Sequence, residues 1–205
     1  MSETFKPVEG DVEILRREQC FRGFYSLDRL HLRHRLFDGS MGAEIDREVF
    51  LRHDAVCVLP YDPVNDKVVL IEQFRIGAIG KSDNPWLLEL VAGLIDKDEQ
   101  PEEVARREAV EEAGLELGAL WPVTSYFPSP GGSNERVYLY VGRCDSDGAG
   151  GVFGLADEGE DIRVHVWSLD EALAAIGDGR IDNAASIIAL QWLALNRTAV
   201  REAWS

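Results

Sequence analysis

Basic residues are scarce in this sequence of 205 residues, where 21 lysines and arginines face 37 aspartates and glutamates and the formal net charge is −16. Proteins hold DNA or RNA through clustered lysines and arginines, so this imbalance argues against nucleic-acid binding. The anionic surface of a membrane would repel the chain for the same reason. We therefore expect neither nucleic acid nor a membrane as a partner.

Cysteines and long apolar runs are also few. The three cysteines, Cys20, Cys57 and Cys144, lie far apart and form no CxxC pair, so we expect neither a disulfide framework nor a thiolate zinc site. No apolar run approaches the roughly 20 residues that cross a bilayer. The first residues also lack the basic and apolar regions of a signal peptide. These absences predict a reduced, cytoplasmic setting.

The composition is that of a globular protein, with 45% hydrophobic and 28% charged residues. Residue patterns and turn formers predict strands at 12–17, 24–36, 45–51, 54–59, 67–74, 86–91, 123–127, 136–142 and 162–167. Helices are predicted at 101–113, near 169–176 and near 184–196. Strands, one helix, more strands and two helices indicate an α+β fold, with helices packed on a mixed sheet.

The helix predicted at 101–113 carries an unusual acidic face. At about 100° per residue, Glu108, Glu111 and Glu112 lie on one side of it, where like charges repel by a few tenths of a kcal/mol per pair, roughly. A solvated acidic surface is one explanation for such a face. The other is a hard divalent cation such as Mg²⁺, which takes carboxylate oxygens together with substrate phosphates.

A longer motif surrounds these glutamates. The 23 residues from Gly93 to Leu115 match the Nudix box, G-x5-E-x7-R-E-U-x-E-E-x-G-U with U aliphatic, at every defined position. The sequence therefore resembles the Nudix hydrolases, which mostly cleave a nucleoside diphosphate linked to another moiety. The resemblance implies an α/β/α sandwich with a mixed sheet. It assigns structural roles to Gly93, Glu99 and Gly114.

The same resemblance implies a metal centre within the box. Glu108 and Glu112 would bind the metal together with the carbonyl of Ala92. Arg107 would orient the glutamates, and Glu111 would bridge or assist catalysis. Two or three Mg²⁺ ions are implied, and the sequence leaves both their number and the use of Mn²⁺ open.

An acidic loop at 154–161 resembles the loop that supplies the catalytic base in bacterial ADP-ribose pyrophosphatases. By that match Glu158 would be the general base, with Glu111 as the alternative, and Glu160 would be a further metal ligand. Residues 96–112 hold eight acids and three bases, and residues 157–161 add four acids. More than half of the net negative charge is thus expected beside one metal–phosphate site.

The resemblance to bacterial ADP-ribose pyrophosphatases extends over residues 11–204 and includes the stretches RGFYSLD, VVLIEQFRIGA and SPGGSNER. It implies hydrolysis of ADP-ribose to AMP and ribose 5-phosphate. Seven residues would meet the substrate: Phe24, Arg47, Arg75, Ser129, Pro130, Gly131 and Glu135. Without the resemblance, the SPGG stretch would be interpreted as a turn with no function. Phe24 could equally be an aromatic residue of the core. The alternative functions are hydrolysis of another nucleotide sugar, such as ADP-glucose or GDP-mannose, and non-catalytic sensing of ADP-ribose.

The first 50 residues are not required by the box fold. In the resembling enzymes this segment forms strands that are exchanged across a two-fold homodimer, so we expect residues 1–52 to form a swapped dimerisation segment and residues 53–205 the hydrolase domain. His31 and His34 form an HxxH pair in this segment. We expect both to be surface strand residues, because no third metal ligand stands near them in the sequence.

Overall fold

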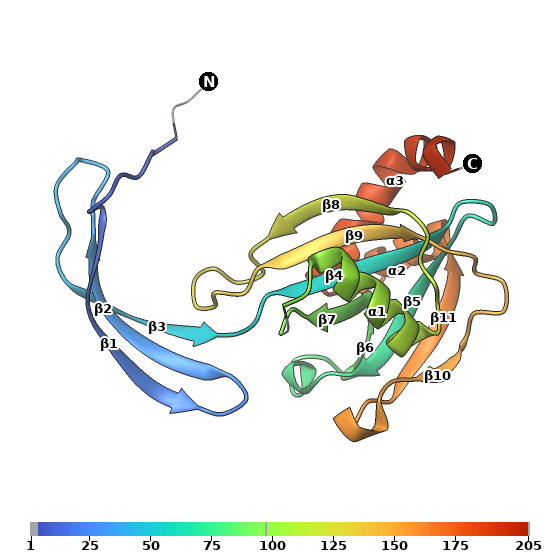
Figure 1. Ribbon diagram of the computed structural model, residues 1–205, viewed down its shortest axis with the longest axis horizontal. Helices are drawn as coiled ribbons and strands as arrows, with labels where there is room; N and C mark the ends of the chain where they lie inside the picture. The colour runs from blue at the N-terminus through green and yellow to red at the C-terminus, as the bar shows by residue number, and fades with distance from the viewer. Residues whose placement is uncertain (1–3, 97, 205) are drawn as a thin grey trace. The chain divides into compact units, whose positions relative to one another are not determined.

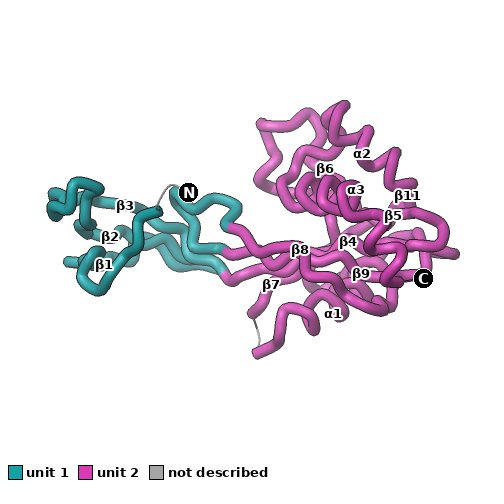
Figure 2. Tube along the Cα trace, turned by 90° about the horizontal axis from the view of Figure 1, so that it is seen from above, with its two compact units in different colours: residues 1–52, 127–135 teal, residues 53–126, 136–205 magenta. Residues whose placement is uncertain are grey.

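The structure is a computed structural model that describes residues 4–96 and 98–204. Its contacts divide the chain into two compact units (Figure 2). Unit 1 consists of residues 1–52 and 127–135, and unit 2 consists of residues 53–126 and 136–205.

Unit 1 contains a three-stranded antiparallel sheet in the order β1-β2-β3 (Figure 1). Its strands are β1 (Val12–Arg22), β2 (Ser26–His34) and β3 (Ile45–Leu51). The loop of residues 127–135 groups with this sheet through backbone pairing. The amide of Phe50 donates to the carbonyl of Gly132 at 2.8 Å, and the amide of Asn134 donates to the carbonyl of Phe50 at 3.3 Å.

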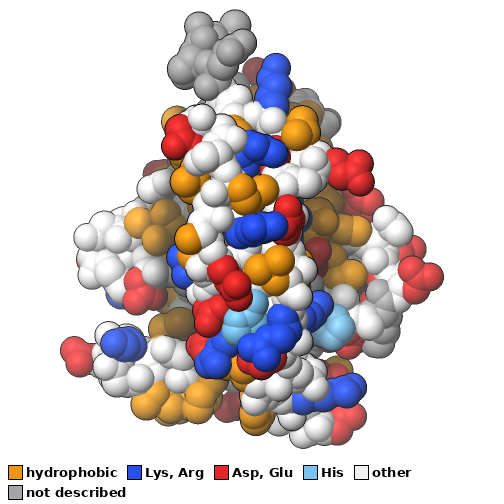
Figure 3. All heavy atoms as spheres, turned by 90° about the vertical axis from the view of Figure 1, so that its left-hand side faces the viewer, with side chains coloured by type: hydrophobic (Ala, Val, Ile, Leu, Met, Phe, Trp, Pro, Cys, Tyr) orange, Lys and Arg blue, Asp and Glu red, His pale blue; other side chains and the backbone are white. Residues whose placement is uncertain are grey.

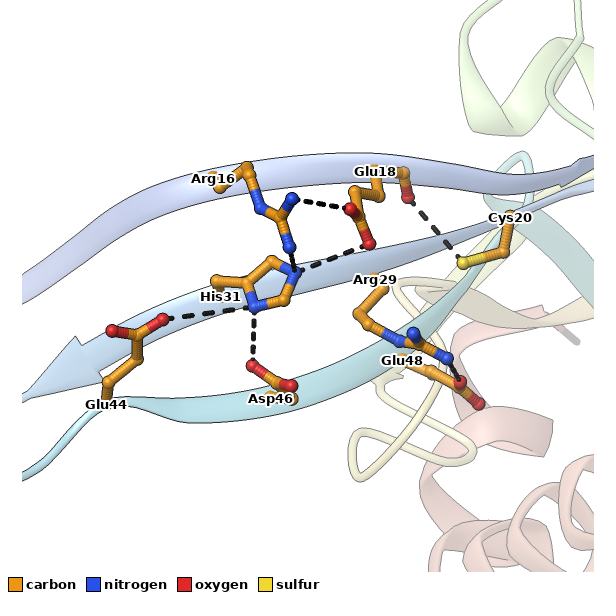
Figure 4. Close-up of polar contacts among 8 residues, drawn as sticks. All are labelled: Arg16, Glu18, Cys20, Arg29, His31, Glu44, Asp46 and Glu48. Atoms are coloured by element: carbon orange, nitrogen blue, oxygen red, sulfur yellow. Dashed lines mark hydrogen bonds and ion pairs between the residues drawn. The ribbon is translucent and has the colours of Figure 1, made fainter.

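A polar row crosses this sheet (Figure 4), because Arg16, His31 and Asp46 are neighbours on three adjacent strands. The Nδ1 atom of His31 lies 2.6 Å from the Asp46 carboxylate, and the Nε2 atom lies 2.8 Å from the Arg16 guanidinium. His31 is only 9% exposed, so the prediction of a surface residue is wrong for it. Its cross-strand neighbours cover it, whereas His34 is exposed as predicted.

Glu44 also approaches His31, with a carboxylate oxygen 3.9 Å from Nδ1. His31, Glu44 and Asp46 are therefore close enough together to hold a metal ion. Arg16 and Asp46 already provide a hydrogen-bond partner for each ring nitrogen, so we assign the row to joining the three strands. Figure 3 shows basic, acidic and histidine side chains side by side on one face of the molecule, with hydrophobic side chains among them.

Unit 2 is built on an eight-stranded sheet with the path β10-β11-β5-β4-β9-β8, in which β6 pairs with β5 and β7 pairs with β4. β4 and β9 run parallel and the other pairs run antiparallel, so the sheet is mixed. The strands are β4 (Ala55–Asp62), β5 (Lys67–Phe74), β6 (Trp86–Glu89), β7 (Val91–Leu94), β8 (Leu120–Tyr126), β9 (Val137–Arg143), β10 (Gly151–Phe153) and β11 (Ile162–Ser168).

Helices cover both faces of this sheet (Figure 1). Helix α1 (Pro101–Ala113) shares one hydrophobic core with alternate residues of β4, such as Val58. Helices α2 (Leu169–Gly177) and α3 (Ala184–Trp204) share a second core, on the other face of the sheet, with residues such as Leu59. Successive strand residues point to opposite faces, so one buried strand serves both cores. The predicted α+β class and α/β/α sandwich are confirmed. No helix in the described part of the chain combines the length and apolarity needed to span a bilayer.

Several elements differ from their predicted bounds, and the first strand, predicted at 12–17, continues to Arg22. The last helix continues to Trp204, beyond the predicted end at residue 196, because its buried final residue contacts the ring of Trp121. The strand predicted at 86–91 is two strands, β6 and β7, which pair with different neighbours. The short strand β10 was not predicted, because three residues carry too little periodicity to be recognised.

Candidate active site

Helix α1 begins and ends at fixed points. Gln100 and Glu103 cap its start reciprocally, and the amide of Gln100 donates to the Glu103 carboxylate at 2.8 Å. Proline at the first helical position suits this start. Gly114 ends the helix in the left-handed conformation, with φ of +63°, which glycine adopts without the strain of a side chain. The acidic face of the helix is therefore held in one register against the sheet.

Strand β7 brings backbone up to that face. The amide of Ala92 donates to the Glu112 carboxylate at 2.9 Å. A Cβ atom at Gly93 would overlap the carboxyl group of Glu108. Glycine at this position is thus a steric requirement, since only a residue without a side chain lets the Glu108 carboxyl lie against the strand.

Arg107 joins the loop before α1 to two of its glutamates. Its guanidinium donates to Glu99 at 3.2 and 3.3 Å, to Glu108 at 2.7 Å and to Glu111 at 3.0 Å. Partial burial of Arg107 opposes its charge, but the three carboxylates outweigh that effect and raise the pKa of the guanidinium. The arrangement fixes the Glu108 and Glu111 side chains relative to the loop.

The carboxyl groups at this centre outnumber the basic side chains described beside them, so they resist ionisation while no cation is bound. Burial raises the pKa of Glu112 to about 8; the bond from Ala92 opposes this rise, and Glu108 and Glu160 add to it. Burial likewise raises the pKa of Glu108 to about 6, although Arg107 opposes the shift. Glu112 is only 2% exposed. Buried oxygen ligands with excess negative charge fit a hard divalent cation such as Mg²⁺.

The acidic loop docks onto the same helix. The amide of Gly154 donates to the carbonyl of Glu111 at 3.3 Å, and the amide of Leu155 donates to the Glu160 carboxylate at 3.0 Å. Glu160 lies close enough to raise the pKa values of both Glu108 and Glu112. Glu158 lies in the 3₁₀ turn η2 (Ala156–Glu158) of this loop and is exposed. The structure therefore brings Glu160 to the carboxylate centre and leaves Glu158 on the surface of the loop.

Arg75 supplies a second positive charge near the centre. It follows β5, and its charge lowers the pKa of Glu112. Its Nε–H donates to the Glu89 carboxylate at 2.6 Å. Glu89 was not among the predicted site residues, although a carboxylate inside the apolar run 86–91 was a signal for it, because a buried charge needs a partner.

The remaining predicted substrate residues belong to unit 1. Phe24 is 80% exposed and makes an edge contact with Tyr25, so the alternative reading as a core aromatic is wrong. Arg47 is exposed and donates to the carbonyl of Asp46 at 2.7 Å. Glu135 is buried and forms an ion pair with Arg52 at 3.1 Å. The other three predicted residues lie in the exposed part of the 127–135 loop: Ser129, Pro130 and Gly131.

Comparison with known proteins identifies the family. The family model described as NUDIX domain matches residues 51–190, so the chain belongs to the NUDIX family. It is 54% identical over 197 residues to the ADP-ribose pyrophosphatase of Escherichia coli, covering 96% of this chain and 94% of that protein. It is 38% identical over 149 residues to the GDP-mannose pyrophosphatase of Pectobacterium atrosepticum, covering 71% and 75% of the two chains.

A solved structure supports the fold. The crystal structure of an ADP compounds hydrolase superposes with a TM-score of 0.72, covers 98% of this chain and 100% of its own, and is 21% identical in sequence. At that identity the likeness shows that the two chains share the Nudix fold.

Proposed function

We propose that this chain is a divalent-metal-dependent hydrolase that cleaves the pyrophosphate bond of ADP-ribose to give AMP and ribose 5-phosphate. The observation that carries the proposal is the gathering of Glu108, Glu112 and Glu160 beside the backbone of Ala92 and Gly93, with more carboxyl groups than neighbouring basic side chains. The identity with the E. coli ADP-ribose pyrophosphatase along nearly the whole chain supports the choice of substrate.

The metal ligands in this proposal are the carbonyl of Ala92 and the carboxylates of Glu108, Glu112 and Glu160. Their donor set consists of oxygen atoms alone, which suits Mg²⁺, or Mn²⁺ in its place, and two or three ions are proposed. Bound there, the metal would neutralise phosphate charge and lower the pKa of a bound water. Arg107 keeps the glutamates in position through its bonds to Glu99, Glu108 and Glu111.

Hydrolysis adds water across the P–O–P linkage. The water oxygen forms a new bond to one phosphorus, and that phosphorus loses its bond to the bridging oxygen, which leaves with the electron pair on the departing phosphate. A carboxylate takes the proton of the attacking water. We propose Glu158 as this base, because its loop docks on α1 through Gly154 and its side chain remains exposed. Glu111 is the alternative base.

A panel of nucleotide sugars tests the choice of substrate. We expect kcat/KM to be highest for ADP-ribose when ADP-ribose, ADP-glucose and GDP-mannose are compared with Mg²⁺ in excess. Faster turnover of GDP-mannose would favour the second candidate, which the similarity to the GDP-mannose pyrophosphatase supports. Tight binding of ADP-ribose without cleavage would identify a sensor instead.

We also propose a homodimer in which residues 1–52 are exchanged between subunits. Its support is the number of large apolar side chains that unit 1 leaves exposed: Val12, Ile14, Phe21, Phe24 and Phe37. A monomeric protein rarely exposes so many large apolar side chains on so small a unit. Phe24 would then stack on the adenine, and Arg47 of the partner subunit would approach it. Light scattering at micromolar concentration should give twice the chain mass, and a fully active monomer would refute the dimer and both adenine contacts.

We propose a cytoplasmic location, for which the cysteines provide the physical support. All three are free thiols, and Cys57 and Cys144 are buried. Free thiols of this kind persist in a reducing compartment.

A further inference from the structure

Arg75 is fixed at two points. Its backbone amide donates to the carbonyl of Pro85 at 2.8 Å, and its side-chain Nε–H donates to Glu89 at 2.6 Å. Glu89 ends strand β6, where it stands opposite Ile71 of β5. The side chain of Glu89 is 18% exposed and that of Arg75 is 42% exposed. The ion pair therefore runs from a partly buried carboxylate outward to a guanidinium that reaches solvent.

The contact with Glu89 uses one edge of the guanidinium. The two terminal nitrogens of Arg75 have no hydrogen-bond partner among the residues that the structure describes. Arginine presents a planar fork of donors that matches two oxygens of a phosphate group. Held at Nε, this fork is left with its terminal donors available to an anion.

Glu89 also keeps Arg75 from pairing with the carboxylates that we propose as metal ligands. The charge of Arg75 acts on Glu112, so the guanidinium lies within electrostatic reach of the carboxylate centre. Without a partner of its own, a flexible arginine beside several carboxylates would pair with one of them. The Glu89 carboxylate holds the guanidinium in a contact that leaves the proposed metal ligands free.

We propose that Glu89 is a positioning residue that orients Arg75 for binding the pyrophosphate of the substrate. The proposal rests on the proposed function, because it assigns a phosphate-binding task to Arg75. Glu89 itself does not touch the substrate. It acts by fixing the arginine before the substrate arrives, which reduces the entropy lost on binding.

A double-mutant cycle tests this relation. The variants Glu89→Gln, Arg75→Ala and the double variant are compared by kcat and KM for ADP-ribose with saturating Mg²⁺. We expect Glu89→Gln to reduce kcat/KM by about 10- to 100-fold, mostly through KM, as expected for the loss of one charged hydrogen bond. In the Arg75→Ala background the same change should have no further effect. Additive losses would overturn the proposal.

Chemical rescue separates orientation from a general loss of structure. Free guanidinium ion should restore part of the activity of Arg75→Ala, because Glu89 remains to hold the added cation. The same ion should not rescue the double variant. Equal rescue in both would show that Glu89 does not hold the cation.

Glu72→Gln is the matched control. Glu72 lies on β5 and also forms ion pairs with neighbours, His165 at 2.9 Å and Arg163 at 3.6 Å, but it is no part of the proposed site. We expect its kcat and KM to equal those of the native chain. If Glu89→Gln does not fold, Glu89→Asp keeps the charge while shortening the side chain, and it should raise KM only while Arg75 is present.

The two proposals fail in different ways. If the native chain does not cleave ADP-ribose, the proposed function fails before any variant is compared. If the native chain cleaves ADP-ribose and the cycle is additive, the role of Glu89 fails and the proposed function stands.

Discussion

The buried Glu112 carboxyl allows a test in which stability and activity respond in opposite directions. The substitution Glu112→Gln removes the ionisable group and keeps an oxygen that accepts the hydrogen bond from the Ala92 amide. Without metal, we expect this variant to be more stable than the native chain at alkaline pH. Because the change removes a proposed metal ligand, we expect turnover with Mg²⁺ to fall by at least about 100-fold.

The size of the expected stability difference follows from the shift in the pKa of Glu112. The pKa of Glu112 is about 8 in the folded chain, against 4.5 for a glutamate in water. Between these values the folded chain retains a proton that the unfolded chain has lost, so rising pH favours unfolding. At 1.36 kcal/mol per pKa unit, this effect lowers the free energy of unfolding of the metal-free native chain by about 3 kcal/mol between roughly pH 5.5 and pH 8.

Urea unfolding in the presence of EDTA measures this penalty. All five tryptophans lie in unit 2, so their fluorescence follows the unit that contains Glu112. The stability difference between Glu112→Gln and the native chain should grow by about 3 kcal/mol from pH 5.5 to pH 8. Glu116→Gln is the matched control, because this exposed glutamate lies just beyond the same helix. It should show no such growth.

Added Mg²⁺ completes the test. A cation that binds only the folded chain stabilises it in proportion to the logarithm of its concentration. Mg²⁺ should therefore restore the stability of the native chain at pH 8 and should stabilise Glu112→Gln much less. If the native chain and the variant unfold with the same pH dependence in EDTA, the folded chain does not raise the pKa of Glu112, and the crowding of carboxyl groups inferred at this centre is refuted.

Two further substitutions test how the box is held. Gly93→Ala should reduce turnover by at least about 100-fold and the free energy of unfolding by about 1–3 kcal/mol, because the added Cβ displaces the Glu108 carboxyl. The control Gly177→Ala adds its Cβ in open space and should change neither kinetics nor stability substantially; native turnover in Gly93→Ala would contradict the steric argument. Glu99→Gln should raise the Mg²⁺ concentration for half-maximal activity by roughly tenfold, because Arg107 loses a charged partner. An unchanged metal requirement, measured by Mg²⁺ titration of the rate, would show that this contact does not orient the ligands.

Features set by spacing along the chain could be predicted from the sequence. Helix α1 has the predicted bounds, because a proline, an acidic turn and a final glycine determine a helix locally. The convergence of Glu108 and Glu112 follows from their separation of four residues on that helix. The alternating apolar pattern likewise identified most strands of the sheet.

Features that depend on contacts between distant segments could not be predicted in this way. The division of residues 86–94 into β6 and β7 depends on which neighbour each half pairs with. The burial of His31 depends on the strands to either side of it, and the link between Arg75 and Glu89 joins residues 14 positions apart. Local periodicity carries no information about such pairings, which require the three-dimensional arrangement of the sheet.

The central claim is that this chain hydrolyses ADP-ribose with the help of a divalent metal. Product analysis by phosphorus NMR or anion-exchange chromatography tests it most directly, with the purified chain, ADP-ribose and Mg²⁺ in one sample and EDTA in a second. We predict AMP and ribose 5-phosphate in equal amounts with Mg²⁺, and intact ADP-ribose with EDTA. Intact ADP-ribose in both samples, or cleavage that continues unchanged in EDTA, would contradict the claim.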